Sequence, residues 1–223
     1  MQARVILKQL KAQSDPRNIA GMARFGINPH NTYGISIPTL RRIAKQTGKD
    51  HRLAQELWKS GIHEARILAA LVDVPEQVTA AQMERWVKDF DSWDVCDQVC
   101  INLFDKTPFA YRQAIAWSRR EEEFVKRAGF ALMAALAWHD KTASDAAFVK
   151  FLPAIKRGAS DERNFVKKAV NWALRQIGKR SRALNRAALA AAREIQQIDS
   201  PAARWIAADA LRELQSPAVL KLM

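Results

Sequence analysis

The sequence predicts an all-α fold, and three observations lead to that prediction. Strand signals are scarce, because β-branched residues rarely alternate with polar ones and no Asn-Gly or Asp-Gly hairpin dipeptide occurs. Only 8 of the 223 residues are Gly. Apolar residues instead return every three or four positions, which is the spacing of one helix face. With 48% hydrophobic residues, the chain can form one substantial core or an elongated array of small units that share a core.

The predicted helices follow one another along the chain with short breaks between them. The clearest helical segments are EARILAALV (64–72), DVCDQVCINLF (94–104), EEFVKRAGFALMAAL (122–136), RNFVKKAVNWALRQI (163–177) and AARWIAADALREL (202–214). Proline marks the breaks at 25–42, 73–79, 105–111 and 151–156. None of these breaks is long or polar enough to be a domain linker, so residues 1–223 are predicted to form a single domain.

Several helical segments repeat one another. FVKRAGFAL begins at Phe124 and FVKKAVNWAL begins at Phe165, 41 residues later, and ARWIAADAL follows at a similar distance. In the first half of the chain, EARILAALV, SWDVCDQV and FVKRAGFAL are spaced by roughly 30 residues. Unequal periods with two helices per unit predict a degenerate HEAT-like solenoid, in which each helical pair buries its apolar face against its neighbours.

The net charge of +13 predicts an acidic partner, and nucleic acid is the commonest one. Basic residues concentrate in 156–186, where ten Lys and Arg stand against two acidic residues. A solvated basic face is the plainer explanation, and the charge alone leaves both open. No apolar run reaches the length of a membrane span and the N-terminus lacks a signal-peptide core, so a cytoplasmic, nucleoid-associated location is expected.

Neither a metal nor a cofactor is predicted. Cys96 and Cys100 lie four residues apart in one apolar run, which favours burial as small hydrophobic side chains over a disulfide. The histidines are scattered, and HEAR (63–66) lacks the second His of a metal-binding helix.

On the helix predicted at 165, polar residues fall beside the apolar stripe. At 100° per residue, Trp172 lies at the edge of that stripe, with Lys168 and Arg175 next to it. The same frame applied to the repeat at Phe124 places Arg127 where Lys168 lies. Basic residues on corresponding faces of adjacent repeats would form a positive track along a DNA backbone.

The helix predicted from residue 92 has a similar edge. Val95, Cys96 and Val99 belong to its core stripe, whereas Trp93 and Asp97 share the edge with Phe104. Asp94, in the first turn, is explained by the helix dipole, with Asp91 or Ser92 as the cap. An indole beside a carboxylate favours a cation, through the ring face and direct charge pairing, and in a DNA-binding protein that cation can be a positively charged base.

These segments resemble the DNA alkylation repair glycosylases of the AlkD type. The similarity runs over most of the chain and is strongest in YGISIPTLRR (33–42), SWDVCDQV (92–99), FVKRAGFAL (124–132) and FVKKAVNWALRQIGKRS (165–181). The resemblance implies a curved all-α fold of HEAT-like repeats that cradles duplex DNA. It also implies hydrolysis of the N-glycosidic bond of cationic alkylpurines such as N3-methyladenine and N7-methylguanine, with the lesion left in the duplex.

The resemblance also assigns site residues. Asp97 matches the catalytic carboxylate, and Trp93 and Trp172 match indoles that pack at the backbone and sugar of the lesion. Arg127 and Arg175 match residues that contact DNA. Three further basic residues of the segment 156–186 are expected to bind DNA: Lys167, Lys168 and Lys179.

The expected protein is therefore a monomeric, monofunctional glycosylase for base excision repair, and its partner is double-stranded DNA with alkylated bases. Two other classes remain open: a non-catalytic HEAT-like protein that binds damaged or branched DNA, and a helical-repeat scaffold for an acidic protein. A helix-hairpin-helix glycosylase is disfavoured, because no Gly-rich hairpin of the L-P-G-V-G kind occurs.

Overall fold

A computed structural model describes residues 2–221, and it confirms the all-α prediction: no strand occurs within that range. The chain divides into two compact units, Met1–Thr107 and Pro108–Met223. The single domain expected over 1–223 stays a prediction, and each unit is described by itself. No helix within the described range combines the length and apolar character needed to cross a bilayer.

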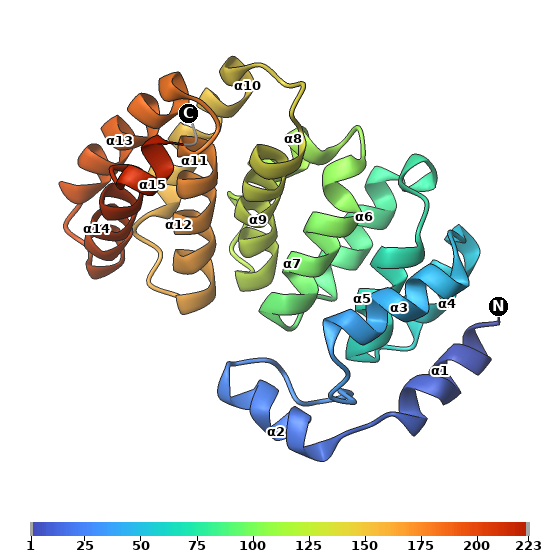
Figure 1. Cartoon of the computed structure of the whole chain (residues 1–223). Coiled ribbons are helices and arrows are strands. Elements are labelled where there is room, and N and C mark those ends of the chain that lie inside the picture. The colour runs from blue at the N-terminus through green and yellow to red at the C-terminus, as the bar shows by residue number, and fades with distance from the viewer. Residues whose placement is uncertain (1, 222–223) are drawn as a thin grey trace. The chain divides into compact units, whose positions relative to one another are not determined.

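Within residues 2–107, the first unit contains seven α-helices and two 3-10 turns. Figure 1 labels the helices. They are α1 (Ala3–Ala12), α2 (Pro16–Arg24), α3 (Ile37–Thr47), α4 (His51–Lys59), α5 (His63–Val72), η1 (Pro75–Gln77), α6 (Ala80–Lys88), α7 (Trp93–Asn102) and η2 (Phe104–Lys106). Its core is centred on α5, which packs against α3, α4 and α7. Trp58 and Trp86 stack within this unit with ring centroids 4.0 Å apart.

The second unit contains eight described α-helices. They are α8 (Ala110–Trp117), α9 (Glu123–His139), α10 (Asp145–Val149), α11 (Leu152–Gly158), α12 (Asn164–Gly178), α13 (Arg182–Gln196), α14 (Pro201–Leu214) and α15 (Pro217–Leu220). The repeated segments form α9 and α12, which lie side by side (Figure 1). Their equivalent rings, Phe124 and Phe165, stack with centroids 5.7 Å apart. The internal repeat therefore corresponds to neighbouring helices.

Capping residues set several helix starts. Asp15, Asp50, Thr79, Ser181 and Ser200 accept backbone N–H groups at the first turns of α2, α4, α6, α13 and α14. Close helix packing depends on small residues. A Cβ added to Gly129 would lie 2.4 Å from the backbone nitrogen of Ser118, so α9 approaches the end of α8 closely because position 129 has no side chain.

A buried carboxylate holds the loop that precedes α3. Glu64 of α5 is fully buried and accepts the backbone N–H groups of Tyr33, Gly34 and Ile35 at 2.7–3.1 Å. Gly34 has a φ of 77°, and a Cβ there would lie 2.6 Å from the carbonyl oxygen of Asp15. The loop thus follows a path that favours glycine, and Glu64 satisfies the N–H groups that this path leaves without a helix or sheet partner.

The residue before Glu64 holds α7. His63 Nε2 lies 2.9 Å from Asp94 Oδ2, and both side chains are largely buried. Burial works to lower the pKa of His63, but the hydrogen bond and the charge of Asp94 outweigh it, so the pKa is raised. Burial works to raise the pKa of Asp94, yet bonds from His63, Ser92 and the Val95 N–H lower it overall.

We predict that Glu64→Gln lowers the free energy of unfolding by about 2 kcal/mol, because the substitution removes a charge that accepts three backbone hydrogen bonds. Chemical denaturation measures the change. Glu56→Gln is the matched control, since Glu56 is exposed and pairs only with Arg52 at 3.3 Å. A decrease no larger for Glu64→Gln than for the control would contradict the role of this carboxylate.

We predict that His63→Gln costs about 3 kcal/mol of stability near pH 5–6, as expected for breaking a buried pair. The raised pKa of His63 means that its contribution is complete below pH 6.5 and fades as the pH rises through the folded-state pKa. The lowered pKa of Asp94 means that its contribution is present above pH 3.8 and fades as the pH falls through the folded-state pKa.

Denaturation midpoints from pH 3 to 9 test this prediction, with the exposed His30→Gln as the control. The difference between parent and His63→Gln should be largest between these limits. A difference that does not vary with pH would mean that His63 contributes packing alone.

Candidate active site

Trp93 and Asp97 lie where the helix frame predicted, at the edge of α7. Both side chains are half-buried, whereas Val95 and Val99 on the core face are fully buried. The indole Nε1 of Trp93 donates to the carbonyl oxygen of Phe25 at 3.1 Å. The main chain at the end of α2 therefore fixes the ring that starts α7, and Asp97 follows one turn later.

Trp93 borders a hollow of about 570 Å³ within the first unit. The hollow is formed by α2, by the 34–36 loop that Glu64 holds, and by the Trp93 ring; its lining residues are Arg17, Asn18, Gly21, Met22, Arg24, Phe25, Ile27, Gly34, Ile35, Ser36 and Trp93. Most of this wall is apolar, with two arginines on the α2 side. Phe25 is 75% exposed although it is aromatic.

The structure adds a partner to the interpretation of Asp94. Asp94 lies in the first turn of α7, as predicted, and it is also buried and bonded to His63. Ser92 is the N-cap residue, yet its hydroxyl donates to Asp94 at 2.7 Å and makes no capping bond. The partner on α5 is 31 residues away in sequence, which a single helix frame does not include.

Phe104 also differs from the expectation. It was predicted to share the edge with Trp93 and Asp97, but it is fully buried. Helix α7 ends at Asn102 and a 3-10 turn follows, so the 100° frame no longer applies at Phe104. Its ring instead contacts Trp86 and Phe90, with centroids 6.3 and 6.4 Å away.

The tryptophans separate into three groups. Trp58, Trp86 and Trp117 are buried, whereas Trp138 and Trp205 are exposed. Trp93 and Trp172 are the two half-buried ones. Trp172 lies on α12, beside a face whose Ala169, Val170 and Ala173 are fully buried, as the sequence predicted.

Burial of Cys96 and Cys100 as free thiols is likewise confirmed, and burial raises the pKa of Cys100.

The predicted DNA-binding residues on the first turns of α9 and α12 have different environments. Lys168 is exposed, whereas Arg127 is 5% exposed and donates from Nη1 to the carbonyl oxygen of Phe165 at 2.5 Å. The two positions are equivalent in the repeat, but α12 covers Arg127 and links it to the next repeat. Lys167 is half-buried, with Nζ 5.3 Å from the ring centroid of Trp205.

Arg175 and Lys179 face acidic residues of α14. Arg175 forms ion pairs with Glu213 and with Asp209, the latter at 3.4 Å, and Lys179 Nζ donates to Glu213 Oε1 at 2.5 Å. Burial works to raise the pKa of Glu213, but the two cations outweigh that effect and lower the pKa. These two predicted phosphate contacts are therefore already paired within the second unit.

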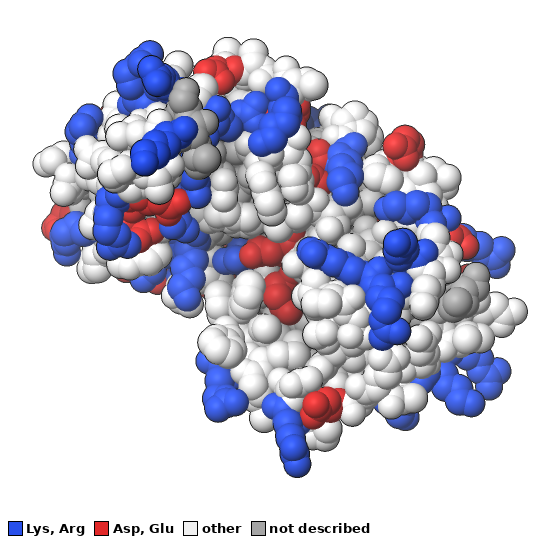
Figure 2. All heavy atoms as spheres, viewed as in Figure 1, with Lys and Arg blue, Asp and Glu red and all other residues white. Residues whose placement is uncertain are grey.

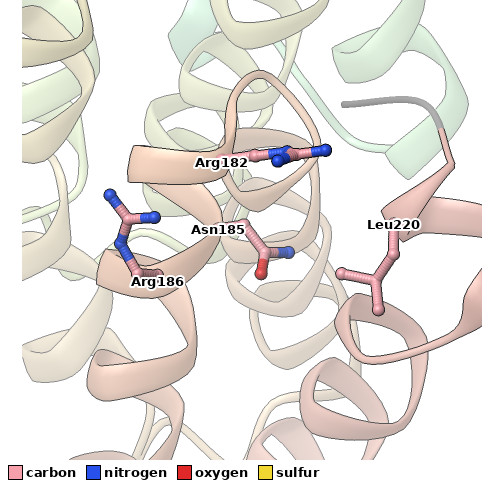
Figure 3. Close-up of a pocket in the computed structure, with 4 residues that line it drawn as sticks. All are labelled: Arg182, Asn185, Arg186 and Leu220. Carbon is pink, nitrogen blue, oxygen red and sulfur yellow. The ribbon is translucent and has the colours of Figure 1, made fainter.

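Two other basic residues of the 156–186 segment, Lys156 and Arg163, are also paired with acidic residues. Asp161 binds Lys126 at 3.2 Å and Arg163 at 2.6 Å, and these bonds hold its pKa at about 2 against the opposing effect of burial. Lys156 pairs with Glu194 at 2.6 Å. Two further arginines, with Asn185 and Leu220, line a hollow of about 250 Å³ at the start of α13 (Figure 3): Arg182 and Arg186.

The predicted site residues divide between the units. The first unit holds Trp93 and Asp97, which share one edge of α7. The second holds Trp172 and the basic positions Arg127, Lys167, Lys168, Arg175 and Lys179, of which Arg175 and Lys179 share Glu213. Sequence analysis missed His63 and Glu64, whose only signal was spacing: His63 and Asp94 are 31 residues apart, close to the period of that half. Residues 2–221 contain no group of three or more acidic, His or Cys side chains arranged to hold a metal ion.

Comparisons with known proteins agree with this architecture. A solved structure described as "A new family of proteins related to the HEAT-like repeat DNA glycosylases with affinity for branched DNA structures" superposes with a TM-score of 0.79 and 19% sequence identity. The match covers 96% of this chain and 95% of that one, and it confirms the HEAT-like fold. None of the curated proteins matches the sequence. The family model for "DNA alkylation repair enzyme" matches residues 6–214, nearly the whole chain. The chain therefore belongs to the DNA alkylation repair enzyme family.

Proposed function

We propose that this protein is a monofunctional DNA glycosylase that removes cationic alkylpurines, N3-methyladenine and N7-methylguanine, from duplex DNA without flipping the base. The observation that carries the proposal is the pairing of Trp93 and Asp97 on one edge of α7 in a member of a DNA alkylation repair family. An indole and a carboxylate one turn apart suit a site where positive charge develops.

The chemistry starts from the charge of the lesion. A purine alkylated at N3 or N7 is already cationic, so it leaves with the electron pair of the glycosidic bond and needs no strong general acid. The positive charge then moves to the sugar, which becomes oxocarbenium-like, and a water molecule adds at C1′ and releases a proton. The protein must stabilise that sugar cation and position the water.

Asp97 is assigned both tasks. As an anion it attracts the sugar cation, and it can accept the proton released by the attacking water. Trp93 and Trp172 are proposed to contact the backbone and sugar of the lesion, where their ring faces favour the same charge. The bond from Trp93 to the Phe25 carbonyl supports this assignment, because a ring held by the main chain costs less to position.

DNA contacts are assigned to Lys168, Lys167, Arg175, Lys179 and Arg127. Lys168 is the exposed member, and an unpaired surface cation binds a phosphate with little rearrangement. Arg175 and Lys179 would exchange Glu213 for phosphate, and Arg127 would have to extend from its bond to Phe165. The protein is proposed to act as a monomer on the nucleoid DNA of the cytoplasm.

A second candidate is a non-catalytic protein that recognises damaged or branched DNA. It is favoured by the structural relative described as having affinity for branched DNA, and by the neutralisation of Arg175 and Lys179. Such a protein would release no base from methylated DNA. It would bind a four-way junction more tightly than a linear duplex of equal length, and it would gain nothing from Asp97 beside Trp93.

We predict that Asp97→Asn lowers excision of N7-methylguanine about 100-fold or more, the scale on which removing an electrostatic stabiliser acts. Duplex binding should persist, since the substituted side chain is assigned no phosphate contact. Single-turnover base release and binding to the same methylated duplex are measured together. Asp91→Asn, at an exposed carboxylate just before α7, is the matched control and should excise like the parent. Excision by Asp97→Asn at the parent rate would remove the basis of the mechanism.

We predict that Trp172→Leu lowers excision by about 2- to 30-fold, equivalent to the roughly 0.5–2 kcal/mol of a cation–π contact. The decrease should appear in the single-turnover rate at saturating protein. Trp138→Leu, at an exposed tryptophan of the neighbouring helix α9, is the control. An equal decrease in both variants would indicate a general effect on DNA binding or folding.

A further inference from the structure

The first 49 residues carry almost exclusively positive charge. Residues 1–49 contain nine Lys and Arg and a single acidic residue, Asp15. All nine are exposed and make no ion pair within residues 2–221, but Lys49 donates to the carbonyl oxygens of Leu71 and Asp73. We call the other eight the N-terminal basic face: Arg4, Lys8, Lys11, Arg17, Arg24, Arg41, Arg42 and Lys45. Asp15 is occupied as the N-cap of α2.

The helix geometry places these Lys and Arg side chains on the sides of α1, α2 and α3 that face away from the core. In α3, Leu40 and Ile43 are buried, and Arg41, Arg42 and Lys45 fall within about 100° on the opposite side. α1 follows the same rule: Ala3, Ile6 and Leu10 are buried, and its three bases, Arg4, Lys8 and Lys11, fall within about 60° of one another. Arg17 and Arg24, seven residues apart, share one side of α2.

The residues predicted to bind DNA in the second unit have different surroundings. The bases predicted to bind DNA there lie largely against acids or carbonyl groups of their own unit, as Arg175, Lys179 and Arg127 do. In Figure 2, the part of the first unit formed by α1, α2 and α3 shows blue groups over a mostly white surface, where red groups are sparse. The N-terminal basic face therefore carries eight exposed cations without an ion pair among the described residues, against four in the segment 156–186: Arg157, Lys168, Arg182 and Arg186.

Such a face has a physical cost that a partner removes. Soluble surfaces usually mix both signs, because eight like charges repel one another and acidic neighbours relieve that repulsion. Here acids are absent from α1, α2 and α3 themselves. Duplex DNA supplies a regular row of negative charges that binds several exposed cations at once and releases its counterions.

We propose that the N-terminal basic face is a second contact surface for the phosphate backbone of duplex DNA, separate from the residues assigned to the lesion. The inference rests on the proposed function only in taking DNA as the partner, and it needs no base excision. Lysine and arginine side chains on the exposed side of a helix can bond phosphate oxygens, and such backbone contact holds the duplex without reading its sequence.

The test is the salt dependence of binding to an unmethylated 30-base-pair duplex. Removing one cation that neutralises a phosphate should reduce the slope of log K against log salt by about 0.9. We expect a reduction of about 2–3 for the α3 variant Arg41→Gln/Arg42→Gln/Lys45→Gln, and a similar one for the α1 variant Arg4→Gln/Lys8→Gln/Lys11→Gln. The control removes the same charge from exposed residues of the second unit, Lys141→Gln/Lys150→Gln/Arg193→Gln, and should keep the slope of the parent. Thermal melting checks that all variants fold.

Three results would overturn the proposal. The first is a slope unchanged in both the α1 and the α3 variants. The second is an equal reduction in the control, which would mean that net charge alone matters. The third is weaker binding of the variants to phosphatidylglycerol vesicles with unchanged binding to DNA, which would identify a membrane surface as the partner. Failure of the glycosylase function appears elsewhere, as absence of base release by the parent protein.

Discussion

The arrangement at the edge of α7 depends on one buried pair, His63 with Asp94. Asp94 lies next to Trp93 and three residues before Asp97, so the first turn of α7 is tied to α5 where the candidate site begins. Glu64, adjacent to His63, ties the same turn of α5 to the loop before α3 and so shapes the hollow beside Trp93. Two neighbouring residues of α5 thus position the two walls of that hollow: His63 positions Trp93 through Asp94, and Glu64 positions the loop before α3. Buried charges of this kind are costly unless fully bonded, and here each has its partners.

Polar contacts between successive repeats explain the two periods in the sequence. In the first unit, Trp58 donates to Asp89, His63 bonds Asp94 and Tyr33 donates to Glu64, each over 31 residues. In the second unit the equivalent contacts span 38 residues, as from Arg127 to Phe165 and from Asn171 to Asp209. The spacing changes because the helices of the second unit are longer, with α9 at 17 residues and α12 at 15 against 10 for α5 and α7. Each repeat therefore bonds to the next at its own period.

These contacts also show where reasoning from sequence succeeds and where it stops. A helix frame orders residues relative to the core of their own helix, so it placed Trp93, Asp97 and Trp172 at edges and the cysteines inside. It carries no information about the neighbouring repeat, and for that reason it missed the His63 partner of Asp94. Arg127 and Lys168 have equivalent positions in the frame, yet the first has α12 above it and the second is exposed. Edge residues within a regular helix were predictable, whereas Phe104, beyond the end of α7, and the partners in the next repeat were not.

The same distinction applies to charge. The number of Lys and Arg residues in the sequence indicated 156–186 as the DNA-binding segment. A cation that is already paired with a carboxylate, however, contributes little net attraction to DNA. Arg175 must break its ion pair with Glu213 before it can bind a phosphate. The binding free energy of that contact is reduced by the lost ion pair and by the half-buried carboxylate that is left without its partner. In the proposed complex, such residues would orient a duplex more than they would attract it. Long-range attraction must come from cations without acidic neighbours, because only they leave an uncompensated field. Lys168, Arg157, Arg182, Arg186 and the Lys and Arg residues of α1, α2 and α3 meet that condition. Affinity and orientation would then reside in different residues of the chain, which makes them separable by substitution.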